Sequence, residues 1–198
     1  MSNSITTIAS SSVLAPSRRG LIRAGGAAVL SAGAIALLGG RESLAQGTAS
    51  ADVNILNVAL GLEHEGIMAY QLGAESGLLQ KDILAVAVLF QTQHKEHADA
   101  LIGTIRKLGG RPVEAKTKAV YAQELNAGSL KSQADVLKLA ARLERGAANA
   151  YIGVIPSFQD RALAQVAARL AADETMHWTA LIGVLKENLP AKAFSFGA

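Results

Sequence analysis

The chain has 198 residues, of which 50% are hydrophobic, 18% charged and 4% aromatic, and it contains no cysteine. That length and composition allow one domain with a sizeable core, and they exclude a disordered protein, a disulfide-linked fold and a cysteine-ligated metal site. The formal net charge of +3 is carried by the first 45 residues, so the remainder is close to neutral and its charge gives no support to nucleic-acid binding.

A pair of arginines, Arg18 and Arg19, lies near the N-terminus in the segment SRRGLIR. The pair and the two apolar residues that follow resemble a twin-arginine export signal. This resemblance implies that the twin-arginine translocase carries the protein, already folded, into the periplasm of a bacterium. Many proteins exported by this route acquire a metal or a cofactor first, so the signal favours a cofactor-binding protein.

Residues 24–40 are uncharged but include five glycines, so they are too short and too weakly hydrophobic for a stable membrane span. The small residues Ser43 and Ala45 then occupy the two positions that a signal peptidase recognises. We therefore predict that residues 1–45 are a signal peptide, which is cleaved after Ala45. Cleavage after Ala51 and retention of the segment as a membrane anchor are the alternatives.

Four segments with apolar residues at helical spacing predict four α-helices, and no segment shows the alternation of a strand. Asp52 is a candidate N-cap for the first helix, and Ser132 or Lys131 is one for the third. Pro156 separates the third helix from the fourth. The predicted helices are residues 52–75, 81–108, 131–155 and 157–188.

The lengths of the connections predict the topology. The first two helices are joined by a few residues, as are the last two, so each pair forms an antiparallel hairpin. Residues 109–129, which begin with two glycines and show little periodicity, are long enough to run along the bundle. The sequence therefore predicts an all-α four-helix domain over residues 46–189, made of two hairpins and one long crossover, with a tail at 190–198.

The two predicted hairpins repeat one another. In the first helix Tyr70 follows Glu63 by seven residues, and in the third helix Tyr151 follows Glu144 by the same interval. The sequence Leu-Ile-Gly at 101–103 recurs at 181–183. Matches at this many positions indicate an internal duplication.

Each predicted helix has an apolar face that is interrupted near its middle by glutamate or histidine. Nearly equal chain lengths on either side of the two tight turns place these interruptions at one height in the bundle. A buried carboxylate without a partner is costly, but a pair of divalent cations would satisfy the group, because carboxylate oxygen and imidazole nitrogen are metal ligands. The six candidate ligands are Glu63, His94, His97, Glu144, Glu174 and His177.

Residues 52–188 resemble a ferritin-like domain of the exported bacterial kind. The segment ILNVALGLEHEGIMAY is similar to that family's first helix, and ADETMHWTAL is similar to its last. The resemblance implies a ferritin-like four-helix bundle in which Glu144 and Glu174 are candidates to bridge two ions. His94 departs from the family pattern, which has glutamate at this position. The ligands that the resemblance implies are Glu63, His97, Glu144, Glu174 and His177.

Histidine at position 94 leaves three carboxylates in place of four, which argues against a symmetric di-iron centre like that of ferritin. The predicted cofactor is iron or manganese, as two ions or one. The site would serve iron handling or oxygen and peroxide chemistry, of the ferroxidase or peroxide-dismutating type if the protein is an enzyme. The alternative is a metal-free bundle that acts as a stress or interaction protein. The expected partners are metal ions, the twin-arginine translocase and, in a homodimer, a second copy of the chain.

Four residues near the candidate ligands have two interpretations each. Tyr70 and Tyr151 either have a supporting or redox role just outside the metal site, or are half-buried core tyrosines with bonded hydroxyls. Gln93 and Asp173, each four residues before a histidine, either orient a ligand or face solvent. His64 is expected to face solvent, because the preceding glutamate points inward.

Overall fold

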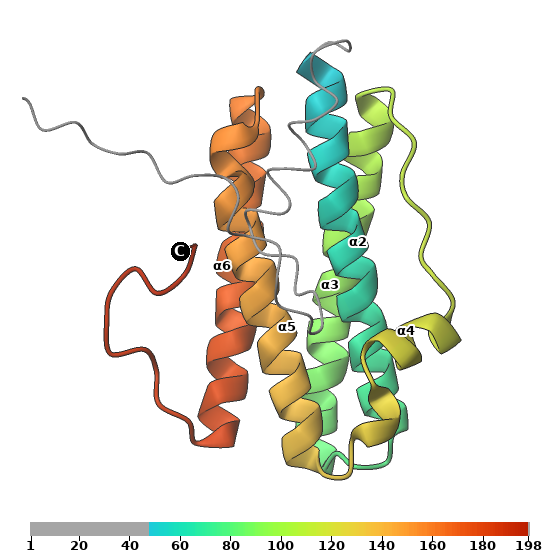
Figure 1. Cartoon of the computed structure of the whole chain (residues 1–198), viewed down its shortest axis with the longest axis vertical. Coiled ribbons are helices and arrows are strands. Elements are labelled where there is room, and N and C mark those ends of the chain that lie inside the picture. The colour runs from blue at the N-terminus through green and yellow to red at the C-terminus, as the bar shows by residue number, and fades with distance from the viewer. Residues whose placement is uncertain (1–47, 198) are drawn as a thin grey trace, which may run out of the picture.

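Four long helices form the domain, and they are arranged as two antiparallel pairs (Figure 1). They are α2 (Thr48–Glu75), α3 (Lys81–Lys107), α5 (Gln133–Val154) and α6 (Arg161–Leu185). The computed structural model describes residues 48–197, and the predicted signal peptide lies outside them. α2 pairs with α3, and α5 pairs with α6. The described residues contain no strand, so the predicted all-α four-helix bundle is confirmed.

The connection between the two hairpins runs along the bundle, as predicted (Figure 1). It contains a helix that the sequence did not predict, α4 (Lys118–Glu124), and then a 3-10 turn at Ala127–Ser129. The Thr117 side chain caps α4 by accepting a hydrogen bond from the Val120 N–H, and Tyr121 is buried in a cluster with side chains of α2. Seven residues with one buried anchor are too few to show helical periodicity, so tertiary packing determines this helix.

The first helix begins earlier than predicted, and Asp52 does not cap it. α2 begins at Thr48, and Asp52 lies in its second turn with 3% of its surface exposed. Its carboxylate accepts hydrogen bonds from the backbone N–H groups of Gln159 at 3.0 Å and Asp160 at 3.2 Å. The sequence supplies the Asp52 carboxylate as an acceptor, but the fold determines which free N–H groups bond to it. Here these N–H groups lie at the start of α6.

Replacing Asp52 with alanine is expected to lower the free energy of unfolding by about 1–3 kcal/mol, because two backbone N–H groups lose their acceptor. Asp52→Asn keeps one acceptor oxygen and should lose less. Urea denaturation followed by circular dichroism measures both changes. Asp99→Ala, at an exposed position of α3, is the control and should stay within about 0.5 kcal/mol of the wild type. Equal effects of Asp52→Ala and Asp99→Ala would contradict the role of Asp52.

The other helix ends lie within one or two residues of the predicted ones, except in the fourth helix. Ser132 caps α5, as predicted. α6 begins only at Arg161, because Asp160 supplies its N-cap side chain. It ends at Leu185, where Lys186 adopts the left-handed conformation with a φ of 56°. The prediction of 157–188 for this helix was therefore too long at both ends.

Two apolar clusters fill the interior of the bundle, one toward each end. One contains Leu60, Leu101 and Ile105, all fully buried. The other contains Phe90 and Leu181. The glutamates and histidines of the interior lie between the two clusters. Water is therefore excluded from both sides, which raises the cost of any polar atom that lacks a partner there.

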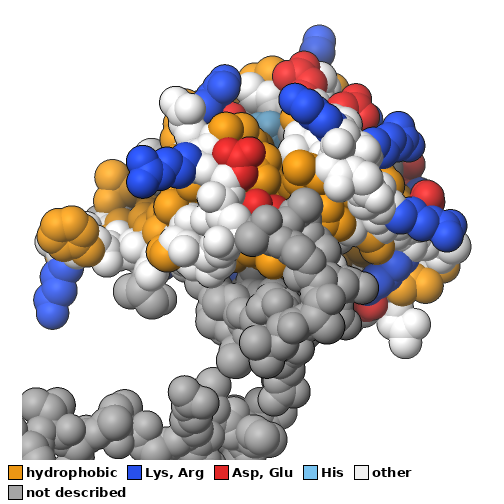
Figure 2. Space-filling model, turned by 90° about the horizontal axis from the view of Figure 1, so that it is seen from above, with side chains coloured by type: hydrophobic (Ala, Val, Ile, Leu, Met, Phe, Trp, Pro, Cys, Tyr) orange, Lys and Arg blue, Asp and Glu red, His pale blue; other side chains and the backbone are white. Residues whose placement is uncertain are grey.

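The surface of the described residues carries charges of both signs. In Figure 2, lysine and arginine side chains are spread around the rim, with aspartate, glutamate and hydrophobic side chains between them. Within residues 48–197, no helix has the length and apolar character needed to cross a membrane. The C-terminal tail covers the side chain of Trp178. The ring of Phe196 packs edge-on against it, with the two ring centroids 5.1 Å apart.

Candidate metal centre

The six candidate ligands meet in the middle of the bundle. All are buried, with at most 9% of any one residue exposed. The step of three residues between the two ligands on α3, and between the two on α6, puts each pair on one helix face. The six are Glu63 on α2, His94 and His97 on α3, Glu144 on α5, and Glu174 and His177 on α6.

These side chains form two overlapping groups, in each of which the ligand atoms lie within 4.8 Å of one another. Ligand atoms about 2.1 Å from a shared ion lie at most about 4.2 Å apart, so small side-chain movements would close either group on an ion. Glu174 belongs to both groups, whereas Glu144, the other predicted bridging candidate, belongs to one. The groups are Glu63, His94, His97 and Glu174, and His94, Glu144, Glu174 and His177.

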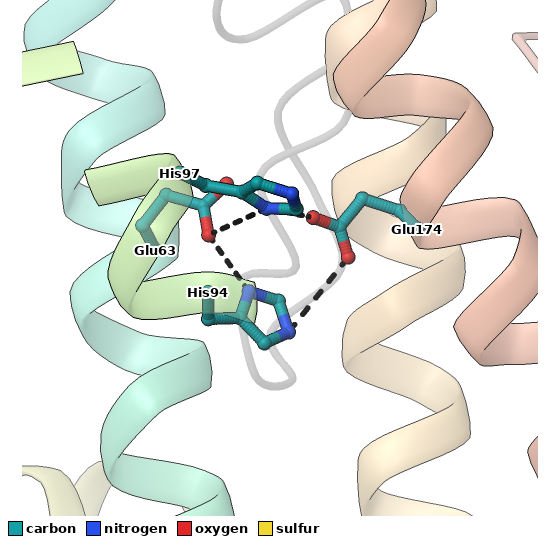
Figure 3. A group of neighbouring side chains, drawn as sticks. All are labelled: Glu63, His94, His97 and Glu174. Carbon is teal, nitrogen blue, oxygen red and sulfur yellow. Dashed lines mark hydrogen bonds and ion pairs between the residues drawn. The ribbon is translucent and has the colours of Figure 1, made fainter. Parts of the chain in front are cut away.

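Figure 3 shows the first group. Glu63 Oε2 lies 2.7 Å from Nδ1 of His94 and 3.6 Å from Nδ1 of His97. Glu174 approaches from the other hairpin, with Oε1 3.2 Å from Nδ1 of His97 and Oε2 3.8 Å from Nε2 of His94. The carboxylates and imidazoles of both hairpins therefore point at a common centre.

The second group is arranged around His177. Its Nδ1 lies 3.5 Å from Glu144 Oε2 and 3.4 Å from Glu174 Oε2. His94 contributes Nε2, which lies 3.3 Å from Glu144 Oε1. The ring of His94 therefore turns Nδ1 toward the first group and Nε2 toward the second.

The two tyrosines of the internal repeat contact the carboxylates of the opposite hairpin. Tyr70 on α2 donates a hydrogen bond to Oε1 of Glu144. Tyr151 on α5 donates one to Oε1 of Glu63. Burial and the neighbouring carboxylates raise the pKa of both hydroxyls well above its ordinary value, so both stay protonated and donate. Each tyrosine is thus a bonded core residue and a neighbour of a candidate ligand.

Gln93 and Asp173 also act across the two hairpins. Gln93 Oε1 lies 2.7 Å from Nε2 of His177, and Asp173 Oδ2 lies 3.3 Å from Nε2 of His97. An amide or carboxylate oxygen only accepts, so both histidines donate through Nε2 and turn Nδ1 toward the centre. Spacing along the sequence identified both residues, but the histidine that each one contacts belongs to the other hairpin.

The electrostatics of the cluster favour positive charge at its centre. Burial lowers the pKa of His97 and His177, but the neighbouring carboxylates outweigh burial and raise these values to about 10 and about 9. Burial raises the pKa of Glu174 to about 7, and the Glu144 carboxylate adds to this rise. A divalent cation would supply the positive charge instead and would displace the imidazole protons.

Five polar atoms in the cluster are buried and have no hydrogen-bond partner among the described residues. An unpaired polar atom in a dry interior costs about 1–3 kcal/mol, and more if it is charged. All five belong to candidate ligands, and each is a carboxylate oxygen or an Nδ1 nitrogen. The donor set therefore fits a metal ion. The atoms are Nδ1 of His97 and His177, Oε2 of Glu144, and both carboxylate oxygens of Glu174.

Gly66 contributes to the centre and was not singled out from the sequence. It lies one turn after Glu63, and a Cβ at this position would be 3.1 Å from Nδ1 and from Cε1 of His94. Comparison of the two repeats could have identified this position from the sequence. Gly66 in the first repeat aligns with Ala147 in the second, and His94 aligns with Glu174. The smaller residue on α2 leaves space for the larger ring on α3.

His64 points away from the candidate ligands, as expected, but it is only partly exposed to solvent. Its Nε2 lies 3.2 Å from the backbone oxygen of Val113 in the crossover, and the residue is half-buried. The crossover covers this side of α2, and Asn57 holds the same segment through hydrogen bonds with Arg111 and Val113. His64 is thus part of the contact between α2 and the crossover and does not reach the candidate ligands.

Comparisons with known proteins identify the fold and the family of the chain. A family model described as a ferritin-like domain matches residues 51–187. No curated protein matches the chain. A solved structure of a conserved hypothetical protein, rv2844, from Mycobacterium tuberculosis is 22% identical, with a TM-score of 0.56 over 74% of this chain and 99% of that one. At this identity the likeness shows the fold alone. The ferritin-like family model covers more than half of this chain, so the chain belongs to the ferritin-like domain family.

Proposed function

We propose that the protein binds iron or manganese, as two ions or one, at the six buried glutamates and histidines. It would use the metal in iron handling or in redox chemistry with oxygen or peroxide. The five buried ligand atoms without hydrogen-bond partners are the observation that carries this proposal. Carboxylate oxygen and imidazole nitrogen suit both iron and manganese.

In this proposal outer hydrogen bonds hold four of the six ligands in position before metal arrives. Tyr70 and Tyr151 each occupy one oxygen of a candidate carboxylate. Gln93 and Asp173 hold the rings of His177 and His97 so that Nδ1 faces the centre. Ligands that are oriented in this way lose little freedom on binding, which strengthens the site.

The apolar surroundings would keep water away from the bound metal. Phe90 stacks on the ring of His177 with the two centroids 4.1 Å apart, and Leu60 and Leu101 close the other side. When bound, the metal supplies reversible electron transfer and open coordination positions for an oxidant. The protein residues orient the ligands, exclude bulk water and leave the protonated hydroxyls of Tyr70 and Tyr151 beside the ligand carboxylates.

Purified protein that has been exported by its own signal is expected to contain one or two ions per chain by elemental analysis. Metal at about 1,000 times its dissociation constant adds about 4 kcal/mol to the stability. Removal with a chelator should therefore lower the melting temperature by about 10 °C. Less than about 0.2 ion per chain, together with a melting temperature that the chelator does not change, would contradict metal binding.

The competing function is that of a metal-free bundle which acts through its surface as a stress or interaction protein. One observation favours it, because His94 lies 2.7 Å from Glu63 and 3.3 Å from Glu144 and can neutralise part of the cluster without metal. It does not explain why atoms of Glu174, His97 and His177 are buried without a hydrogen bond. The elemental analysis described above separates the two functions.

We also propose that residues 1–45 direct export to the periplasm. The support is the Arg18–Arg19 pair and the small residues before the predicted cleavage site. Cleavage after Ala45 leaves α2 whole, because this helix begins at Thr48, whereas cleavage after Ala51 would remove its first turn.

Replacing both Arg18 and Arg19 with lysine is expected to abolish export, because the translocase recognises the arginine pair. The full-length precursor should then accumulate in the cytoplasm of a bacterial host, as measured by cell fractionation and mass spectrometry of the N-terminus. Arg23→Lys, which lies outside the pair, is the control and should still be exported and cleaved. Processed periplasmic protein from the double variant would contradict a twin-arginine signal.

A further inference from the structure

An apolar cavity lies inside the bundle beside the candidate metal centre. It has a volume of about 100 Å³. It lies between the C-terminal parts of α2 and α6 and the N-terminal parts of α3 and α5. Its walls include Ala87 on α3, Leu137 on α5 and Leu181 on α6. Ala180 and Val184, which are exposed on α6, also line it, so the cavity reaches the surface there.

The lining gives the cavity a clear chemical preference. Among the described residues that line it, only Tyr70 has a polar side chain, and its hydroxyl already donates to Glu144. A water molecule needs two to four polar partners to be held, and the side chains of residues 48–197 that line this cavity do not offer them. An engineered apolar cavity of about 150 Å³ in another protein stays dry and binds benzene or xenon. A cavity of this kind and size therefore suits a small, uncharged, apolar molecule.

A second, smaller space lies beside both this cavity and the candidate ligands. It has a volume of about 20 Å³ and is lined by His94 and Glu144. Three residues line both spaces, namely Ala69, Tyr70 and Ala140. A volume above about 10–15 Å³ holds one molecule of the size of water. The ring of Tyr70 therefore separates a dry apolar chamber from a space of one small molecule beside the ligands.

We propose that the apolar cavity binds a small apolar molecule of the size of dioxygen and passes it along Tyr70 to the candidate metal centre. The binding of such a molecule follows from the volume and the lining alone. Its identity as dioxygen rests on the proposed redox function, because dioxygen is the reactant of this class that the centre would use. In this proposal the cavity holds the oxidant and forms the first part of its route to the centre.

Xenon is the probe for the cavity, since it is apolar and strongly scattering. Crystals of the mature protein under xenon pressure are expected to show a xenon atom between Ala87 and Leu181. Ala87→Leu adds three carbon atoms to this space, and the xenon should be lost. Ala85→Leu, at an exposed position two residues away on the same helix, is the matched control and should keep it. Because overpacking can unfold a protein, Ala180→Leu at the mouth is a second blocking variant.

Oxidation of the ferrous-loaded protein tests the route. The blocking variants are expected to lose most of the rate with dissolved dioxygen. They should keep their metal content, and they should keep the rate with hydrogen peroxide, which is polar and not selected by an apolar chamber. The control Ala85→Leu should behave as the wild type with both oxidants.

The outcomes separate the cavity from the proposed function. Absence of xenon from the wild-type cavity would overturn the inference even if the protein holds metal. Xenon that is lost in both blocking variants, with an unchanged dioxygen rate, would overturn the route. Xenon in the cavity of a protein that binds no metal would support the binding site and would refute the proposed redox function.

Discussion

Replacing Glu174 with glutamine is expected to abolish metal binding without destabilising the metal-free protein. Glu174 belongs to both ligand groups, and neither of its oxygens has a hydrogen-bond partner among the described residues. The loss of this carboxylate should therefore lower the affinity for every ion in the site by about 100-fold or more. In the metal-free protein the carboxylate is costly, because burial and Glu144 raise its pKa to about 7. At a pH above this value, glutamine removes that buried charge.

Metal content and melting temperature should therefore move in different directions in this variant. Elemental analysis is expected to show loss of metal. In the presence of a chelator, the melting temperature of Glu174→Gln should equal or exceed that of the wild type. Glu96→Gln is the matched control, because Glu96 is exposed on α3 between the two candidate histidines. If both variants keep the same metal content, Glu174 is not a ligand.

Replacing Gly66 with alanine is expected to weaken metal binding by displacing His94. The new Cβ would lie 3.1 Å from two atoms of the imidazole ring, so the ring must move by a few tenths of an ångström. Displacement of a candidate ligand should reduce the affinity by about 10–100-fold. Gly61→Ala is the matched control on the same helix, since its Cβ would meet nothing within 4 Å. That variant should gain about 0.5–1 kcal/mol of stability from helix propensity and keep its metal.

The double variant Gly66→Ala with His94→Glu completes this test. It reproduces the pairing of the second repeat, in which Ala147 accompanies Glu174. If Gly66 is present to leave space for the ring of His94, the double variant should bind metal more tightly than Gly66→Ala alone. Titration with ferrous or manganous ions measures the affinities. Equal metal binding by Gly66→Ala and Gly61→Ala would show that the space at Gly66 is not needed.

The sequence by itself determined the helices and the candidate ligands. Apolar spacing of three and four residues identifies a buried helix face, and a glutamate such as Glu63 in the middle of such a face needs a buried partner to offset the cost of its desolvation. The lengths of the connections then determined the order of the helices, because a connection of a few residues permits only an antiparallel neighbour. The repeat of Glu63 and Tyr70 as Glu144 and Tyr151 strengthened the assignment of the site.

Only the tertiary structure decided which side chains contact one another across the two hairpins. Tyr70 bonds to Glu144 and Gln93 to His177, although each tyrosine and each polar partner lies near another candidate ligand in the sequence. Periodicity reports the face of a single helix, whereas these contacts depend on the relative height and rotation of two helices from different hairpins. The same reason explains why Asp52 was assigned as a cap and why α4 was missed, since both depend on what lies opposite them in the fold.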